Sequence, residues 1–282
     1  MQSALRLTAA KRPNIALIIG SDLRDILFAV RIQKRFPALV DLWFQVPPPF
    51  STQTQRARAP NRIGMAWLKR LAALVFASRS ECDEQREVEQ RMLGDEIDSL
   101  RKGRYVEADI VQDPNASDLI ARLRKISPYF ILTTENIALG KEVRNCARGL
   151  VLSRCDGWLP DYFGKQAIER ALYRRDWKKV GSSIVLLGDN PLSSQIVRRA
   201  TCCLAEDDTP EICLARSGAL GTDLMCDVVE AVIRSREIRY CTEAPPNSVV
   251  ADTSELGNLA MHKFRRGLPR LIRSDLDARH RV

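Results

Sequence analysis

The segment from Val151 to Val197 constrains the fold more than any other part of this sequence. It consists of short apolar runs, one stretch with helical periodicity, and connecting turns that contain glycine, proline and aspartate. The pattern predicts a strand, a tight loop, a helix, a strand, a loop and a final strand, in that order. Such an alternation is typical of a layered sheet-and-helix domain.

The rest of the chain extends this alternation on both sides. A lone glycine, Gly20, ends the first apolar run, and it does not make up a dinucleotide-binding signature. Thr209 and Pro210 have the residue types preferred at the N-cap and first position of a helix, which we expect to run to Ile233. We predict strands at 14–20, 40–46, 105–111, 129–134 and 195–205, and helices at 23–36 and 116–126. Together they predict an α/β fold with a doubly wound, mostly parallel Rossmann-like sheet.

Two other regions are polar or strongly charged. Residues 51–62 contain no acidic side chain and predict an exposed loop, whereas 63–100 predict a helical region with mixed charges. The chain becomes polar after residue 234, and 263–281 contain seven Lys or Arg against two Asp. We therefore expect an α/β domain over 1–235 and a short, polar, basic C-terminal extension over 236–282.

The net charge, the lengths of the apolar runs and the cysteine content indicate which partners and which cellular location to expect. The formal charge of +9 favours an anionic small molecule such as a phosphate or nucleotide sugar, but no RNA-binding motif accompanies it, so we do not expect nucleic acid. No apolar run is long enough for a transmembrane helix, and residues 1–13 lack a secretory signal. The eight cysteines lack metal-binding spacing, and both histidines, His262 and His280, lie in the tail. We expect no metal site, free thiols and a cytoplasmic location.

Several motifs in this chain resemble a known enzyme family. They are the turn Leu159-Pro160-Asp161-Tyr162-Phe163-Gly164, the strand entry Val180-Gly181, and the pair Asp208-Thr209 before a helix. They are similar to motifs of the 10-formyltetrahydrofolate-dependent formyltransferases, which include methionyl-tRNA, glycinamide-ribonucleotide and sugar N-formyltransferases. The resemblance covers about 14–233, is strongest over 151–197, and implies a formyltransferase-like fold.

The catalytic positions of that family are altered here. The resemblance places an Asn-x-His pair just before the turn and an Asp in a later loop, and this chain has Ser153, Cys155 and Leu192 there. Loss of one oxyanion donor costs roughly two or three powers of ten in rate, and loss of a general acid–base costs about as much. The resemblance therefore implies a pseudoenzyme that acts by binding, with a protein partner or a related enzyme as the expected target.

Two alternatives remain open at this point. The first is a formyl or acyl transferase, or a hydrolase, of altered chemistry that uses Cys155, Asp156 or Asp189 in the same cleft, with Ser153 as a hydrogen-bond donor. Against it, Cys155 also fits a buried apolar filler, and Asp189 fits a Gly-Asp-Asn-Pro turn. The second is a basic adaptor for nucleic acid or a membrane surface.

The carrier-binding loop of the family corresponds to Thr134, Glu135, Asn136 and Ile137. The family has a small glycine-containing turn at this place, and Glu135 adds bulk and negative charge. Its carboxylate would oppose the glutamate tail of a folate, unless it points to solvent. The resemblance alone implies 10-formyltetrahydrofolate as a cofactor.

Overall fold

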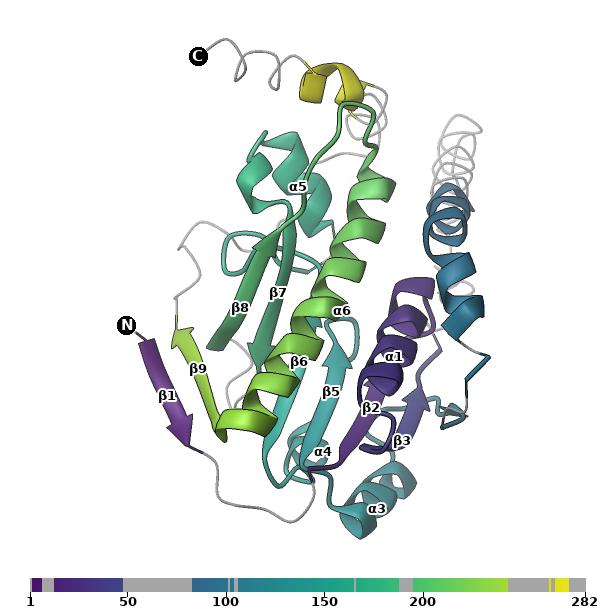
Figure 1. Cartoon of the computed structure of the whole chain (residues 1–282), viewed down its shortest axis with the longest axis vertical. Coiled ribbons are helices and arrows are strands. Elements are labelled where there is room, and N and C mark those ends of the chain that lie inside the picture. The colour runs from purple at the N-terminus through teal and green to yellow at the C-terminus, as the bar shows by residue number, and fades with distance from the viewer. Residues whose placement is uncertain are drawn as a thin grey trace, which may run out of the picture.

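A single mixed sheet forms the centre of the computed structural model, which describes residues 2–6, 13–47, 83–100, 102–103, 106–164, 166–187, 195–242, 264 and 267–273 (Figure 1). In chain order its strands are β1 (Gln2–Arg6), β2 (Ile15–Ile19), β3 (Val40–Gln45), β4 (Asp109–Ile110), β5 (Phe130–Thr134), β6 (Leu150–Cys155), β7 (Gly181–Leu186), β8 (Gln195–Thr201) and β9 (Glu237–Thr242). Across the described sheet the spatial order is β1-β9-β8-β7-β6-β5-β2-β3-β4.

The sheet confirms the predicted α/β class, but not the expectation that it is mostly parallel. Strands β2 to β6 pair in parallel. From β6 onward every described neighbour is antiparallel, through β7, β8, β9 and β1. The alternation of strands and helices did not determine strand direction here, because β8 and β9 are antiparallel although a long helix, 210–235, connects them. Four of the eight neighbouring strand pairs in the described sheet are antiparallel, and β7 and β9 run opposite to the other strands.

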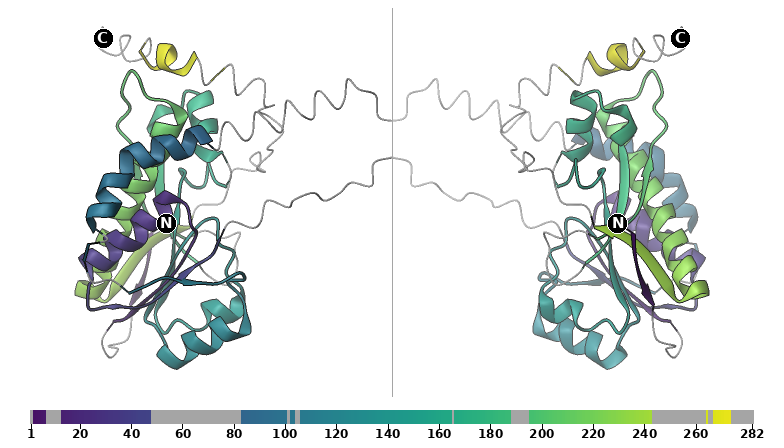
Figure 2. Two further views of the ribbon diagram at one scale, coloured as in Figure 1. Left: turned by 90° about the vertical axis from the view of Figure 1, so that its right-hand side faces the viewer. Right: turned by 90° about the vertical axis from the view of Figure 1, so that its left-hand side faces the viewer.

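Helices lie on both faces of the sheet. They are α1 (Leu23–Arg35), α3 (Ser117–Ile126), α4 (Lys141–Arg144), α5 (Ala167–Tyr173), the 3₁₀ helix η1 (Trp177–Lys179) and α6 (Pro210–Ser235). A further helix, at 83–100, packs its Leu93 and Ile97 against Leu27 and Val30 of α1. Figure 2 shows α1, α6 and helix 83–100 on one face, and α3 and α4 on the other.

The central strands are buried because helices lie on both sides of them. All five residues of β2 and all five of β5 are buried, as expected for a strand with no solvent-facing side. Their side chains alternate between a core shared with α1 and α6 and a second core shared with α3 and α4.

Helix α6 begins as the sequence predicts. The Thr209 hydroxyl accepts a hydrogen bond from the backbone N–H of Ile212 at 3.3 Å, and Pro210 is the first helical residue. The helix ends at Ser235, two residues beyond the predicted end. None of the described helices is both long and apolar enough to cross a membrane.

Strands β1 and β9 were not predicted. Their sequences are polar, and they pair with each other at one edge of the sheet, so neither has the continuous apolar run of a buried strand. The boundary at residue 235 stays a prediction, although the sheet continues past it in β9. Phe264, Leu268 and Ile272 also pack with Ile168 and Leu172 of α5. The predicted strand at 105–111 is reduced to β4, and the predicted elements at 51–82 lie outside the described residues.

Candidate functional site

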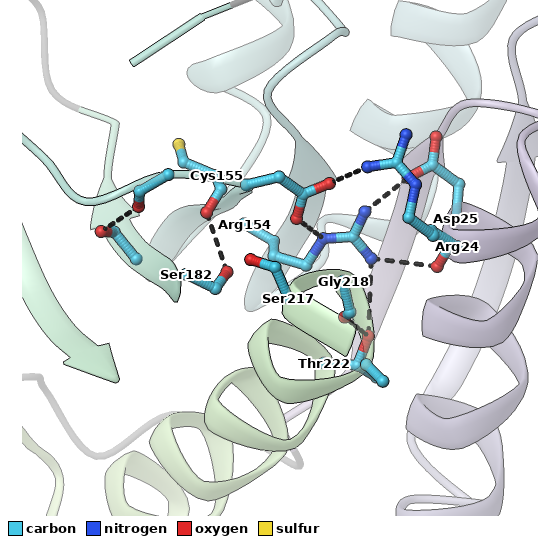
Figure 3. Close-up of polar contacts among 12 residues, drawn as sticks. Arg24, Asp25, Arg154, Cys155, Ser182, Ser217, Gly218 and Thr222 are labelled. Atoms are coloured by element: carbon cyan, nitrogen blue, oxygen red, sulfur yellow. Dashed lines mark hydrogen bonds and ion pairs between the residues drawn. The ribbon is translucent and has the colours of Figure 1, made fainter. Parts of the chain in front are cut away.

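Strand β6 places Ser153 and Cys155, which the sequence resemblance aligns with the catalytic Asn and His of the family, on one face of the sheet. Leu150 and Leu152 of this strand belong to the core under α1 and α6, and Val151 belongs to the opposite core. Because side chains alternate along a strand, Ser153 and Cys155 point away from α6, whereas Arg154 points toward it. The side chains of Arg154 and Cys155 therefore extend to opposite faces of the sheet (Figure 3).

Ser153 and Cys155 are both buried, with exposed fractions of 3% and 7%. Cys155 packs in an apolar cluster with Leu159, Val185 and Ile196. Burial, and next the carboxylates of Glu135 and Asp156, raise the pKa of the Cys155 thiol well above its usual value. The thiol is therefore protonated near neutral pH, and an un-ionised thiol is a poor nucleophile.

The turn after β6 covers this cluster and is held by several hydrogen bonds. The backbone N–H of Leu159 donates to Ser183 Oγ at 3.1 Å, and the same hydroxyl donates to the carbonyl of Gly157 at 2.7 Å. Arg199 donates to the carbonyl of Leu159 at 2.7 Å, and its guanidinium lies over the ring of Trp158. The turn that begins at Leu159 thus packs over the Cys155 side chain.

The opposite face of β6 carries a buried network of ion pairs. Arg154, 2% exposed, donates to Asp25 Oδ1 at 2.9 Å, and its Nε lies 3.3 Å from Asp156 Oδ1. Arg24 of α1 pairs with Asp156 as well, and donates through its Nε to Glu89 of helix 83–100 at 2.7 Å. Figure 3 shows the guanidinium groups of Arg24 and Arg154 near each other, with the side chain of Asp25 beside them. The network ties together β6, α1 and helix 83–100.

Helix α6 leaves space for both arginines by means of two glycines. A Cβ at Gly218 would lie 2.8 Å from Cδ of Arg24. A Cβ at Gly221 would lie 2.9 Å from Cγ of Arg154 and 2.2 Å from Ser182 Oγ. Arg154 also donates to the carbonyl of Arg24 at 3.0 Å and to Thr222 of α6 at 3.4 Å. The fit of α6 on the sheet therefore depends on residues without side chains at these two places.

The electrostatics of the network reflect burial and an excess of carboxylates. Burial opposes the charge of Arg24, but the carboxylates of Asp156 and Glu89 outweigh it and hold the pKa of Arg24 above its usual value. Burial raises the pKa of Asp25 to about 6, although Arg154 and Arg24 act against the rise. Arg24 is therefore charged at neutral pH, and Asp25 is mostly ionised there.

The loop after β5 lies next to this network. The backbone N–H of Glu135 donates to the carbonyl of Arg154 at 2.9 Å, and that of Ile137 donates to the carbonyl of Thr134 at 3.0 Å. Burial, and then the Asp156 carboxylate, raise the pKa of Glu135 to about 8. Thr134 is buried, with no hydrogen-bond partner for its hydroxyl, and Asn136 is exposed.

A pocket of about 510 Å³ opens at the carboxyl ends of β2, β3 and β5, where ligands bind in α/β sheets. Asn136 and Ile137 line it, and Asp22 and Asp25 line it from the first loop and helix. Ser153, Cys155 and Asp156 are not among its lining residues. The structure therefore separates the two catalytic-position residues from this pocket, while it brings half of the predicted carrier loop to it.

The residues of this pocket do not fit a folate carrier that presents its carboxylates here. The described lining residues include two carboxylates and no cationic side chain. Asp189 and Leu192 lie outside the described residues, so their positions stay predictions. Within the described ranges, no group of three or more His, Cys, Asp or Glu side chains is arranged to hold a metal ion.

Sequence reasoning missed the ion-pair network. It considered Asp156 only as a residue facing the cleft, and the structure instead pairs Asp156 with Arg24 and Arg154. One signal was present in the sequence: an arginine within the apolar run of β6. A buried arginine needs a carboxylate partner, but the sequence does not say that the partners come from residues 25 and 89.

Comparisons with known proteins agree with the fold. No family model matches the sequence, and no curated protein matches it significantly. The phosphoribosylglycinamide formyltransferase from Anaplasma phagocytophilum has a TM-score of 0.50 and 14% identity, over 79% of this chain and 88% of that chain. WlaRD, a sugar 3N-formyl transferase solved in the presence of dTDP and 5-N-formyl-THF, has a TM-score of 0.50 and 10% identity, over 91% of this chain and 79% of that chain. At such identities the likeness concerns the fold, and the chain therefore has a formyltransferase-like fold.

Proposed function

We propose that this protein binds a ligand or partner on a formyltransferase-like fold and does not transfer a formyl group from 10-formyltetrahydrofolate. One observation carries the proposal: the side chains at the two described catalytic positions, Ser153 and Cys155, are buried on the side of β6 that an apolar turn covers. The ionisable residues beside them, Arg154 and Asp156, are held in ion pairs with other parts of the chain.

The chemistry of formyl transfer supports this proposal. The reaction passes through a tetrahedral oxyanion, which needs positioned hydrogen-bond donors and a group that moves a proton. The Ser153 hydroxyl donates to the carbonyl of Arg154 at 3.4 Å, and the Cys155 thiol is un-ionised and packed among aliphatic side chains. Neither arrangement provides a donor or a base to a bound amine.

The alternative of altered chemistry receives less support from the described residues. It would need a thiolate at Cys155 or a carboxylate at Asp156 that reaches a substrate. The raised pKa of Cys155 and the 5% exposed fraction of Asp156 oppose both. We also propose a cytoplasmic location, which the seven described cysteines support because all of them are free thiols.

A turnover assay tests the proposal. Purified protein would be incubated with 10-formyltetrahydrofolate and a panel of amines that includes glycinamide ribonucleotide and nucleotide-linked amino sugars. An active formyltransferase in the same mixture would serve as the positive control. We expect tetrahydrofolate to form no faster than in a protein-free mixture. Turnover at ordinary enzymatic rates that disappears in Cys155→Ala, with an unchanged melting temperature, would contradict the proposal and favour altered chemistry.

A further inference from the structure

The loop after β5, residues 135–138, forms one wall of the pocket and rests on β6. The backbone N–H of Glu135 donates to the carbonyl of Arg154 at 2.9 Å, and this bond holds the first loop residue against the strand. The three residues that follow Glu135 line the pocket. Glu135 is the only ionisable residue of the loop, and its side chain is partly buried. The charge of the loop can therefore change only at Glu135.

The buried network beside the loop already contains more carboxylates than arginines. Its two cations, Arg24 and Arg154, form ion pairs with three acidic residues, namely Asp25, Glu89 and Asp156. None of the ion pairs among the described residues joins either arginine to Glu135. An ionised Glu135 would therefore add a fourth carboxylate to a cluster that has two cations, and such an excess of charge is unfavourable away from water.

The groups that face Glu135 from α1 and β6 favour its protonated form. Burial, and next the carboxylate of Asp156, raise the pKa of Glu135 to about 8, while Arg24 and Arg154 oppose the rise. The Cys155 thiol is un-ionised near neutral pH, so it adds no charge. Asp156 Oδ1 is buried and makes no hydrogen bond within the described part of the chain, and only the protonated form of Glu135 has an O–H to donate. The closed loop therefore keeps the proton at neutral pH.

Opening of the loop would remove the conflict between the carboxylates. When the loop leaves β6, the Glu135 carboxyl enters water and its pKa returns to about 4.5. The closed loop thus binds a proton up to about pH 8, whereas the open loop releases it above about pH 4.5. Because opening releases this proton, it becomes more favourable as the pH rises from about 4.5 to about 8, and it changes no further at higher pH.

We propose that residues 135–138 form a pH-sensitive gate of the pocket, which opens when Glu135 loses its proton and closes when the carboxyl is protonated. Opening breaks the hydrogen bond between the Glu135 N–H and the Arg154 carbonyl, and it displaces the wall that the loop contributes to the pocket. The gate goes beyond the proposed binding function, and its test requires neither a ligand nor turnover.

Hydrogen exchange of single backbone N–H groups measures the opening. The full chain would be followed by NMR at pH 6, 7, 8 and 9, and each exchange rate would be divided by that of an unstructured peptide at the same pH. We expect the opening equilibrium at the Glu135 N–H to rise by at least about tenfold between pH 6 and pH 8, and to stay level above pH 8. The Arg148 N–H is the internal control, because it donates to the carbonyl of Pro128 at 2.8 Å near the other end of β6. We expect its opening equilibrium to change by less than about twofold.

Two substitutions of the same kind locate the effect. Glu135→Gln keeps the size of the side chain but cannot ionise, so we expect the loop to stay closed and the rise between pH 6 and pH 8 to disappear. Glu107→Gln removes a carboxyl from an exposed position, and we expect its pH profile to match that of the parent.

Three results would overturn the inference: no rise of the opening equilibrium with pH in the parent, an equal rise in Glu135→Gln, or an equal rise at the Arg148 N–H. The last result would indicate that the whole domain opens instead of the loop. These outcomes are independent of the turnover assay. Formyl transfer together with the expected pH profile would refute the proposed function and leave the gate standing, and no turnover together with a flat pH profile would do the reverse.

Discussion

Replacing Arg154 with methionine is expected to lower the free energy of unfolding by about 3–5 kcal/mol. The guanidinium is 2% exposed and pairs with Asp25 and Asp156. Methionine fills most of the space, but Asp25 would keep a buried charge without its closest partner. Urea denaturation of the full chain measures the loss.

Arg198→Met provides the matched control for this substitution. Arg198 lies on β8, is about half exposed, and is 3.7 Å from Asp227, which is also exposed. We expect a change below about 1 kcal/mol there. In a double-mutant cycle, Asp25→Asn should lower the free energy of unfolding less in the Arg154→Met variant than in the parent protein. Equal stability of the Arg154 and Arg198 variants would show that the network does not hold the fold together.

Replacing Glu135 with glutamine is expected to raise stability at alkaline pH. The pKa of Glu135 is about 8 in the folded protein and about 4.5 in its unperturbed state. The folded state therefore binds a proton that the unfolded chain releases, and stability falls as the pH rises from about 4.5 to about 8. Glutamine cannot ionise, so the free energy of unfolding of the variant should not show this part of the decline. At pH 8.5 we expect it to be about 2 kcal/mol higher than that of the parent.

The shape of the pH profile distinguishes Glu135 from its neighbours. The carboxylate of Asp156 and the guanidinium groups of Arg24 and Arg154 all act on it. The raised pKa of Asp25 also makes the stability fall with rising pH, but only up to about pH 6. This fall in stability should persist in the Glu135→Gln variant. Glu107→Gln, at an exposed position, should follow the parent at every pH. A parent whose stability does not fall between pH 6 and 8.5 would contradict the assignment.

The sequence predicted those elements whose pattern is local. The apolar runs of β2 and β5, the periodicity of α1 and the Thr209-Pro210 start of α6 each lie within one segment, and all are confirmed. Strands β1 and β9 were missed because their polar sequences lack that signal. The antiparallel half was missed because strand direction depends on pairing between distant segments, which no single segment encodes.

In the candidate site, too, features encoded within one segment could be predicted, and contacts between distant segments could not. The placement of Arg154 on the face opposite Cys155 follows from alternation along β6, because side-chain direction in a strand depends on position alone. The partners of Arg154 could not be predicted, because Asp25 is 129 residues away in the sequence. The same holds for the pocket, which combines residues from loops after β2, β3, β4 and β5.

The rate of thiol labelling at Cys155 tests most directly whether the buried side of β6 is closed to small molecules. Native protein would be treated with iodoacetamide, and modification of each cysteine would be followed by peptide mass spectrometry. Exposed Cys203 is the internal control. We predict that Cys155 reacts at least about a hundredfold more slowly than Cys203, and reacts readily only in denaturant, because its thiol is buried and un-ionised. Native-state labelling of Cys155 at a rate close to that of Cys203 would show an open, reactive site and would contradict the account.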